Sequence, residues 1–158
     1  MISPAPSRVA TFIGAALLLG TLTPVHAGEC PAGKSMDGAI ETGPMTPKDV
    51  TDDVISAIDL TKDYGVDGRQ LRLRKLVVQP GGIVPWHGHA ERPANIYILE
   101  GEITEYRSTC AAPIVHRTGD VVAEQGAVFH WWKNEGSKPV TLLSADLLPP
   151  QADSKETM

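Results

Sequence analysis

The sequence of 158 residues has few aromatic residues, two cysteines and no concentration of positive charge. Its 14 basic residues stand against 19 acidic ones, which gives a net charge of −5. Without a basic patch, the chain lacks the electrostatic footprint of a protein that binds nucleic acid or an anionic membrane surface. It also has no internal repeat, no low-complexity tract and no long amphipathic helical pattern. These absences predict one globular domain of short elements that binds neither nucleic acid nor an anionic membrane surface.

The longest apolar run lies at the N-terminus and is typical of an export signal. Arg8 precedes the apolar stretch Val9–Leu22, and the small residues at 25–27 form a cleavage site. The stretch is short for a membrane span of about 20 residues. We therefore expect residues 1–27 to be a signal peptide and the protein to be periplasmic or secreted, with no membrane association after cleavage. Removing the signal leaves 131 residues, which is enough for one compact domain.

The two cysteines, Cys30 and Cys110, predict a disulfide. They lack the C-x-x-C spacing of a redox pair, and an even count in an oxidising compartment favours pairing. The bond would close a loop of roughly 80 residues and contribute on the order of 4 kcal/mol to stability in the chain-entropy model. It would also attach the irregular N-terminal segment to the domain. Two free or buried thiols are the alternative.

Short strands separated by turn residues account for most of the remaining sequence. Residues 28–60 are predicted to be an N-terminal arm packed on the domain, with a short helical turn leading into a strand over 49–60. Residues 61–150 form the predicted domain, and 151–158 a flexible tail. Close spacing of strands with glycine-containing turns indicates an antiparallel sandwich or barrel. The predicted strands cover 71–78, 83–89, 95–99, 103–107, 113–117, 121–123, 128–132 and 140–147.

Two histidines on one predicted strand give the sharpest chemical signal. His87 and His89 are two residues apart, so on an extended strand their imidazoles point to the same face. Neutral imidazole is the commonest metal ligand and suits iron, zinc, copper and nickel. His130, on a later predicted strand, is the candidate third ligand. The alternative for all three is an ordinary polar or packing role on a strand.

The motifs around these histidines resemble the two conserved motifs of the cupin superfamily. The first spans Gly82 to Gly101 and contains H-x-H followed by a strand that ends in Leu-Glu-Gly, and the second spans Gly119 to Asn134 and contains His130. The resemblance implies an all-β fold, the antiparallel double-stranded β-helix or cupin jelly roll. It further implies a divalent metal inside one mouth of the barrel, held by His87, His89 and His130. Many cupins pair edge strands, so a homodimer is also implied.

The sequence departs from the cupin pattern at the fourth ligand. The family's glutamate position holds Ala94, and the adjacent Asn95 points to the opposite face of the strand. Glu91, in the loop after His89, is a candidate substitute. Without a carboxylate the site would be similar to the three-histidine sites of thiol dioxygenases and of diketone-cleaving, quercetin-dioxygenase-like cupins, where ferrous iron binds substrate and oxygen.

We therefore predict an exported metal-binding cupin with dioxygenase-like chemistry on a small molecule. Iron is the first candidate for the ion, and zinc, manganese and nickel also suit the donors. Tyr97 is a candidate acid or base if its phenol reaches the metal, and part of a β-rich strand otherwise. The alternatives are a non-catalytic cupin that binds a metal or a small ligand, and a module in which the metal only holds the fold.

The positions of five charged residues near the motifs are predicted from the strand pattern. Glu102 and Glu105 are predicted on a solvated strand edge, and Arg72 and Arg74 on the surface. Arg92 follows His89 in the loop and is predicted nearer the mouth of the barrel, where it could hold an anionic substrate.

Overall fold

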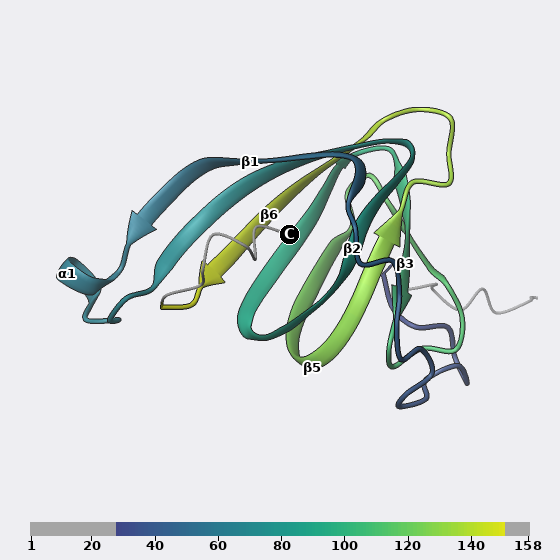
Figure 1. Cartoon of the computed structure of the whole chain (residues 1–158), viewed down its shortest axis with the longest axis horizontal. Coiled ribbons are helices and arrows are strands. Elements are labelled where there is room, and N and C mark those ends of the chain that lie inside the picture. The colour runs from purple at the N-terminus through teal and green to yellow at the C-terminus, as the bar shows by residue number, and fades with distance from the viewer. Residues whose placement is uncertain (1–27, 151–158) are drawn as a thin grey trace, which may run out of the picture.

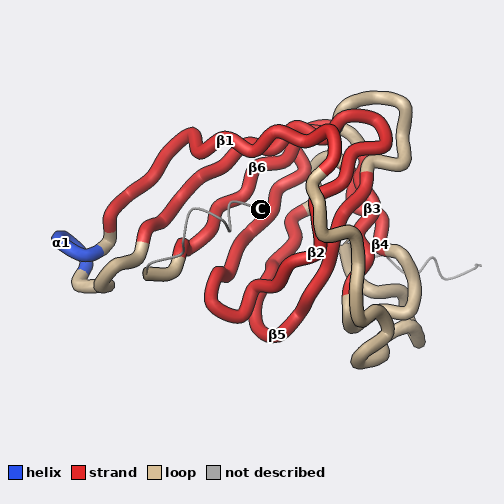
Figure 2. The backbone as a smooth tube through the Cα atoms, viewed as in Figure 1, coloured by secondary structure: helices blue, strands red, loops and turns tan. Residues whose placement is uncertain are grey.

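The computed structural model describes residues 28–150, so the predicted signal peptide and the C-terminal tail lie outside the described residues. The order of elements is β1 (Lys48–Asp59), α1 (Thr61–Tyr64), β2 (Gln70–Glu100), β3 (Glu102–Arg107), β4 (Ile114–Arg117), β5 (Val121–Lys133) and β6 (Val140–Leu148). The strands pair antiparallel in the order β1-β2-β5-β3-β4, and β6 also pairs with β2. Figures 1 and 2 show the sheet curling over on itself, with α1 as a single turn at one end. The predicted all-β jelly roll is confirmed.

β2 runs as three limbs that form the frame of the barrel. The first limb, 70–78, lies between β1 and β6; the second, 83–89, pairs with β5; the third, 94–100, pairs with β5 and β6. The chain reverses between the first two limbs at Gly81, whose φ of 73° favours glycine. A side chain on Gly82 would meet two backbone oxygens at 2.8 Å. The predicted strands 71–78, 83–89 and 95–99 correspond to these limbs.

β1 corrects the prediction for the segment 49–60. Lys48–Asp59 is strand throughout, and the helical turn follows it at Thr61 instead of preceding it. β1 pairs with the first limb of β2, so part of the predicted arm belongs to the sheet. The apolar residues Val54, Ile55 and Ile58 are about half exposed, at 49%, 52% and 47%. Their spacing imitates the period of an amphipathic helix, which explains the error.

The hydrophobic core fills the interior between the limbs of β2 and the strands that pair with them. Alternate residues of each strand point inward, as strand geometry requires. The buried residues are Leu76, Val78, Val84, Ala94, Ile96, Ile98, Ile103, Val122, Trp132, Val140 and Leu142. Among residues 28–150, no helix is long and apolar enough to cross a membrane.

A disulfide fastens the N-terminal arm to the barrel, as predicted. Cys30 and Cys110 are bonded, with their Cα atoms 5.7 Å apart and a sequence separation of 80. The arm continues along the barrel, where Ser35 forms an isolated antiparallel β-bridge with Cys110. Further on, the carbonyl of Pro44 accepts a hydrogen bond from the backbone amide of Trp86 at 2.7 Å. Figure 1 shows the arm, in purple, beside β3 and away from α1. The arm therefore reaches the strand that carries the two neighbouring histidines.

Candidate metal centre

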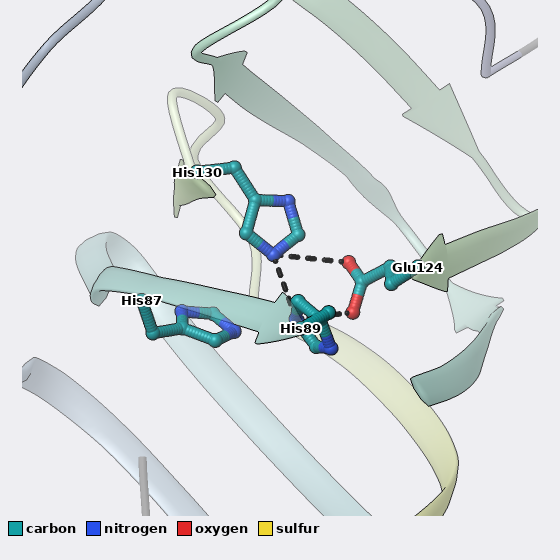
Figure 3. Close-up of side chains that lie close together, drawn as sticks. All are labelled: His87, His89, Glu124 and His130. Carbon is teal, nitrogen blue, oxygen red and sulfur yellow. Dashed lines mark hydrogen bonds and ion pairs between the residues drawn. The ribbon is translucent and has the colours of Figure 1, made fainter. Parts of the chain in front are cut away.

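The three predicted histidines lie together, and a fourth side chain, Glu124, joins them (Figure 3). One ligand atom from each of the four side chains lies within 4.8 Å of those of the others. His87 and His89 belong to the second limb of β2, and Glu124 and His130 to β5. The register of the two strands sets His87 opposite His130. The cluster is buried except for His87, which is partly exposed.

Each imidazole is held by an oxygen atom on its outer nitrogen. Nδ1 of His87 lies 2.8 Å from the carbonyl of Pro85, and Nδ1 of His89 lies 2.8 Å from the carbonyl of Arg92. Nδ1 of His130 lies 2.6 Å from Oε1 of Glu105. Because these oxygens accept, each Nδ1 carries the proton, and a neutral ring then keeps a free lone pair on Nε2. This tautomer and this outer support are what histidine metal ligands use.

On the inner side of the cluster, the Nε2 lone pairs of two histidines lie close to each other. Nε2 of His89 lies 3.0 Å from Nε2 of His130. The carboxylate of Glu124 lies 2.9 Å from the first nitrogen and 3.3 Å from the second. With both protons on Nδ1, no hydrogen lies between these atoms, so the arrangement requires a positive charge at the centre. Three imidazoles and one carboxylate fit a divalent ion such as iron, manganese, zinc or nickel.

Glu105 stands behind His130 and corrects its prediction as a solvated edge residue. It is fully buried and accepts hydrogen bonds from Arg107 at 2.8 Å and from His116 at 2.9 Å, besides that from His130. Burial alone would raise the pKa of Glu105, but these hydrogen bonds outweigh it and hold the pKa well below its usual range. The ionised carboxylate orients His130. The indole nitrogen of Trp132 lies 3.2 Å from the same Nδ1, but a nitrogen that carries its own proton does not accept that bond.

The metal-free cluster takes up a proton preferentially at His130. Burial lowers the pKa of His87 well below its usual value, and the neighbouring His130 adds to this effect. Burial also opposes protonation of His130, but the negative charge of Glu124 and the hydrogen bond to Glu105 outweigh it and raise the pKa. A proton on His130 and a metal ion at the centre are therefore competitors for the same lone pair.

Glu124 is the functional candidate that the sequence interpretation missed. The strand register places it directly opposite Ala94, the residue at the family's glutamate position. The carboxylate has thus moved from β2 to the facing residue of β5. A signal was available, because Glu124 precedes His130 by an even number of residues and so shares its face of the strand. Interpreting 124–126 as a turn hid this, whereas β5 continues through it from Val121 to Lys133.

Glu91 and Tyr97 are not brought to the cluster. Glu91 is exposed, and its carbonyl accepts a hydrogen bond from Arg69 at 3.1 Å. Tyr97 is 39% exposed. Its neighbours on the third limb, Ile96 and Ile98, are buried, so Tyr97 points to the outer face.

A cavity of about 30 Å³ adjoins the cluster inside the barrel. Its lining residues include His87, His89 and Glu124 of the cluster, and also Arg74 and Arg92. This space holds roughly two water molecules, since one needs about 10–15 Å³.

The position of the arginines corrects the prediction that Arg72 and Arg74 lie on the surface. Their exposed fractions are only 6% and 5%. The guanidinium of Arg72 donates two hydrogen bonds to Asp146, at 2.9 and 2.8 Å.

Comparisons with known proteins agree with this architecture. Residues 74–146 match the family model described as the cupin domain. Germin-like protein subfamily 2 member 2 of Arabidopsis thaliana is 29% identical over 94 residues, which cover 58% of this chain and 43% of that protein. Nectarin-1 of Nicotiana langsdorffii x Nicotiana sanderae is 26% identical over 95 residues, which cover 58% and 42%. The chain spans less than half the length of these two curated relatives.

Two solved structures superpose on part of the chain. The cupin domain of an XRE family transcriptional regulator from Enterobacter cloacae superposes with a TM-score of 0.49 at 15% identity, covering 66% of this chain and 100% of that one. A predicted oxalate decarboxylase from Thermotoga maritima superposes with a TM-score of 0.43 at 18% identity, covering 66% and 93%.

Proposed function

Since the chain belongs to the cupin superfamily, with residues 74–146 matching the cupin domain, we propose that it is a small metalloenzyme. It binds one divalent ion through His87, His89, Glu124 and His130. The observation that carries the proposal is the meeting of the Nε2 atoms of His89 and His130 with the carboxylate of Glu124, at distances of 2.9–3.3 Å. Iron is the first candidate, and manganese, zinc and nickel also suit these donors.

The reaction proposed for this site is an oxidation of a small molecule by dioxygen. A bound ion would supply Lewis acidity and, for iron or manganese, redox chemistry. Glu124 leaves the ion with less net positive charge than three neutral histidines alone. The supporting groups, Glu105 and the carbonyl of Arg92, keep His130 and His89 in the tautomer that leaves Nε2 free.

We also propose that the mature protein works in the periplasm or outside the cell, beginning after Ala27. The disulfide between Cys30 and Cys110 supports this location, since such bonds persist in oxidising compartments.

A non-catalytic cupin that binds an ion or a very small ligand is the second candidate. The cavity of about 30 Å³ inside the barrel favours it, whereas a second pocket of about 420 Å³, which His87 also lines, falls within the roughly 300–1,000 Å³ of pockets for drug-sized ligands. Turnover separates the two functions. A binding protein would be stabilised by its ligand without consuming it.

The test is metal content by elemental analysis of untagged protein from its native compartment, followed by dioxygen consumption with candidate substrates. We expect about one ion per chain in the parent. The variants His87→Ala and Glu124→Ala should lose the ion and remain folded by circular dichroism. Glu91→Ala is the matched control and should keep it. A folded parent without metal would contradict the proposal, and a Glu124→Ala variant that keeps its ion would restore the three-histidine site.

A further inference from the structure

Three arginines and two aspartates form a buried ion network beside the same cavity. Arg72 pairs with Asp146 through two hydrogen bonds. Arg74 donates to Asp52 and, at 3.4 Å, to Ser144. Arg92 is the third cation, with a side chain only 11% exposed. Three positive charges against two negative ones leave a surplus of one positive charge in the interior.

The surplus falls on atoms that have no hydrogen-bond partner among the described residues. Nη1 of Arg92 is buried and unpartnered, since the closest carboxylate oxygen of Asp146 is 3.7 Å away. Nε of Arg74 also makes no hydrogen bond, although it lies 3.3 Å from Oδ2 of Asp146, and one acceptor, Oδ1 of Asp52, makes none either. All three residues line the cavity that His87 and Glu124 line. A buried charged donor without an acceptor costs free energy unless a ligand supplies the acceptor.

We infer that Arg92, with Arg74 beside it, binds the carboxylate of a small substrate whose other end faces the histidine cluster. The planar guanidinium matches a carboxylate, which accepts its hydrogen bonds with charge assistance. Oδ1 of Asp52 then takes a hydroxyl or N–H group of the same molecule. The inference deepens the proposed function and rests on it for the statement that the ligand is a substrate.

Charge and size narrow this substrate class further. A divalent ion with Glu124 would leave one positive charge at the histidine side, and the arginine network leaves another. An anion is therefore favoured over a neutral molecule of the same shape. The cavity volume of about 30 Å³ leaves room inside the barrel for only a few non-hydrogen atoms of this anion.

The experiment titrates the metal-loaded protein with acetate and with its neutral analogue acetamide, at constant pH and ionic strength. Binding is measured by thermal stabilisation and, on Co²⁺-loaded protein, by visible absorption. We expect acetate to bind at least about tenfold more tightly than acetamide, and Arg92→Met to weaken acetate binding by about 10- to 100-fold, since hydrogen bonds to charged groups contribute about 1.5–3 kcal/mol. Arg92→Met should keep the metal, because Arg92 supports His89 through its backbone carbonyl. Arg117→Met, at an exposed arginine paired with Glu102, is the control and should bind acetate like the parent.

Equal acetate binding by the parent and Arg92→Met would overturn the inference, because the anion would then contact the metal alone. Equal binding of acetamide, or no acetate binding by the parent, would overturn it as well. Arg92→Lys serves if Arg92→Met does not fold; it keeps the charge, loses the planar fork, and should also weaken acetate binding. Metal content measured on the same samples separates the two proposals. If the parent contains no metal and is still stabilised by acetate, while the Arg92→Met variant is not, the metal site is refuted and the anion site is supported.

Discussion

Two buried charged clusters, the arginine network and the histidine cluster, border one cavity. Their charges are balanced in different ways. In the arginine network, Arg72 and Asp146 satisfy each other through paired hydrogen bonds. In the histidine cluster with neutral rings protonated on Nδ1, Nε2 of His89, Nε2 of His130 and the carboxylate of Glu124 lie close together with no hydrogen-bond donor among them. The first cluster pairs most of its charges within the protein, but leaves Nη1 of Arg92, Nε of Arg74 and Oδ1 of Asp52 without hydrogen bonds. The second requires a metal ion or an added proton at His130, so burial of polar groups alone does not distinguish a structural network from a binding site.

Both clusters arise from the same structural device, a cross-strand pair. Arg72 lies opposite Asp146 on β6, and His87 lies opposite His130 on β5. Ala94 lies between the clusters, with Glu124 opposite it on one side and Asp146 on the other. A glutamate at position 94 would therefore stand between two carboxylates. This repulsion gives a physical reason for alanine there once Glu124 supplies the carboxylate.

The largest effect is expected from breaking the arginine network. Asp146→Ala leaves Arg72 and Arg74 buried without their shared carboxylate, which should lower the free energy of unfolding by about 3–5 kcal/mol. Denaturant unfolding of the metal-free protein measures it. A loss below about 1 kcal/mol would show that these arginines are solvated, contrary to their burial.

The next largest effect is expected from removing or moving the carboxylate that binds the metal ion. An ion at 100 times its dissociation constant should stabilise the parent by about 2.7 kcal/mol, and Glu124→Ala should remove most of that gain. The double variant Ala94→Glu/Glu124→Ala returns the carboxylate to β2 and should recover metal binding. Calorimetric titration and thermal unfolding provide the measurements. Ala94→Glu alone should not recover or improve binding, because Glu124 and Asp146 flank the new carboxylate.

Acidification should separate the metal-loaded from the metal-free protein. The pKa of His130 is raised in the folded protein, so protons compete with the metal from a higher pH than at an ordinary histidine. Below that folded pKa, the metal dissociation constant should rise about tenfold for each unit by which the pH falls. In the metal-free protein, acidification has the opposite effect on stability, because it protonates His130. The contribution of His130 to stability is complete below its unfolded pKa and is lost as the pH rises through its folded pKa.

Metal titrations at a series of pH values check this behaviour. Glu105→Gln removes one of the groups that raise the pKa of His130 and should move the onset of competition to lower pH. A dissociation constant that does not change between neutral and mildly acidic pH would contradict the assignment of His130 as a ligand.

The smallest effect is expected from an exposed ion pair, which calibrates the buried ones. Arg117 and Glu102 lie 2.9 Å apart, with side chains 62% and 56% exposed. Glu102→Gln should change the free energy of unfolding by less than about 1 kcal/mol, and high salt should reduce even that. The same unfolding assay as for Asp146→Ala makes the comparison direct. An equal loss of unfolding free energy in both variants would mean that burial does not increase the cost of breaking the arginine network.

Local pattern was sufficient to predict most of the strands and to place His87 and His89 on one face, but it misplaced the helical turn next to β1 and divided β5. Turn residues such as Gly81 and Gly82 end the limbs of β2, and a spacing of two residues fixes the common face. Glu124 escaped notice because a glycine two residues later made its segment look like a turn. Arg72 and Arg74 were misplaced because their partner, Asp146, lies more than 70 residues away in the sequence. Such a pairing depends on register between distant strands, which composition does not reveal.

The disulfide also has a topological consequence for the candidate metal centre. The loop that Cys30 and Cys110 close, 80 residues apart, contains His87 and His89, whereas Glu124 and His130 lie beyond it. An ion bound by all four side chains would therefore act as a second crosslink, joining the closed loop to the chain that follows it. In the oxidised protein the loop is already tethered before the ion binds, so less chain entropy remains to be lost on metal binding than in the reduced protein.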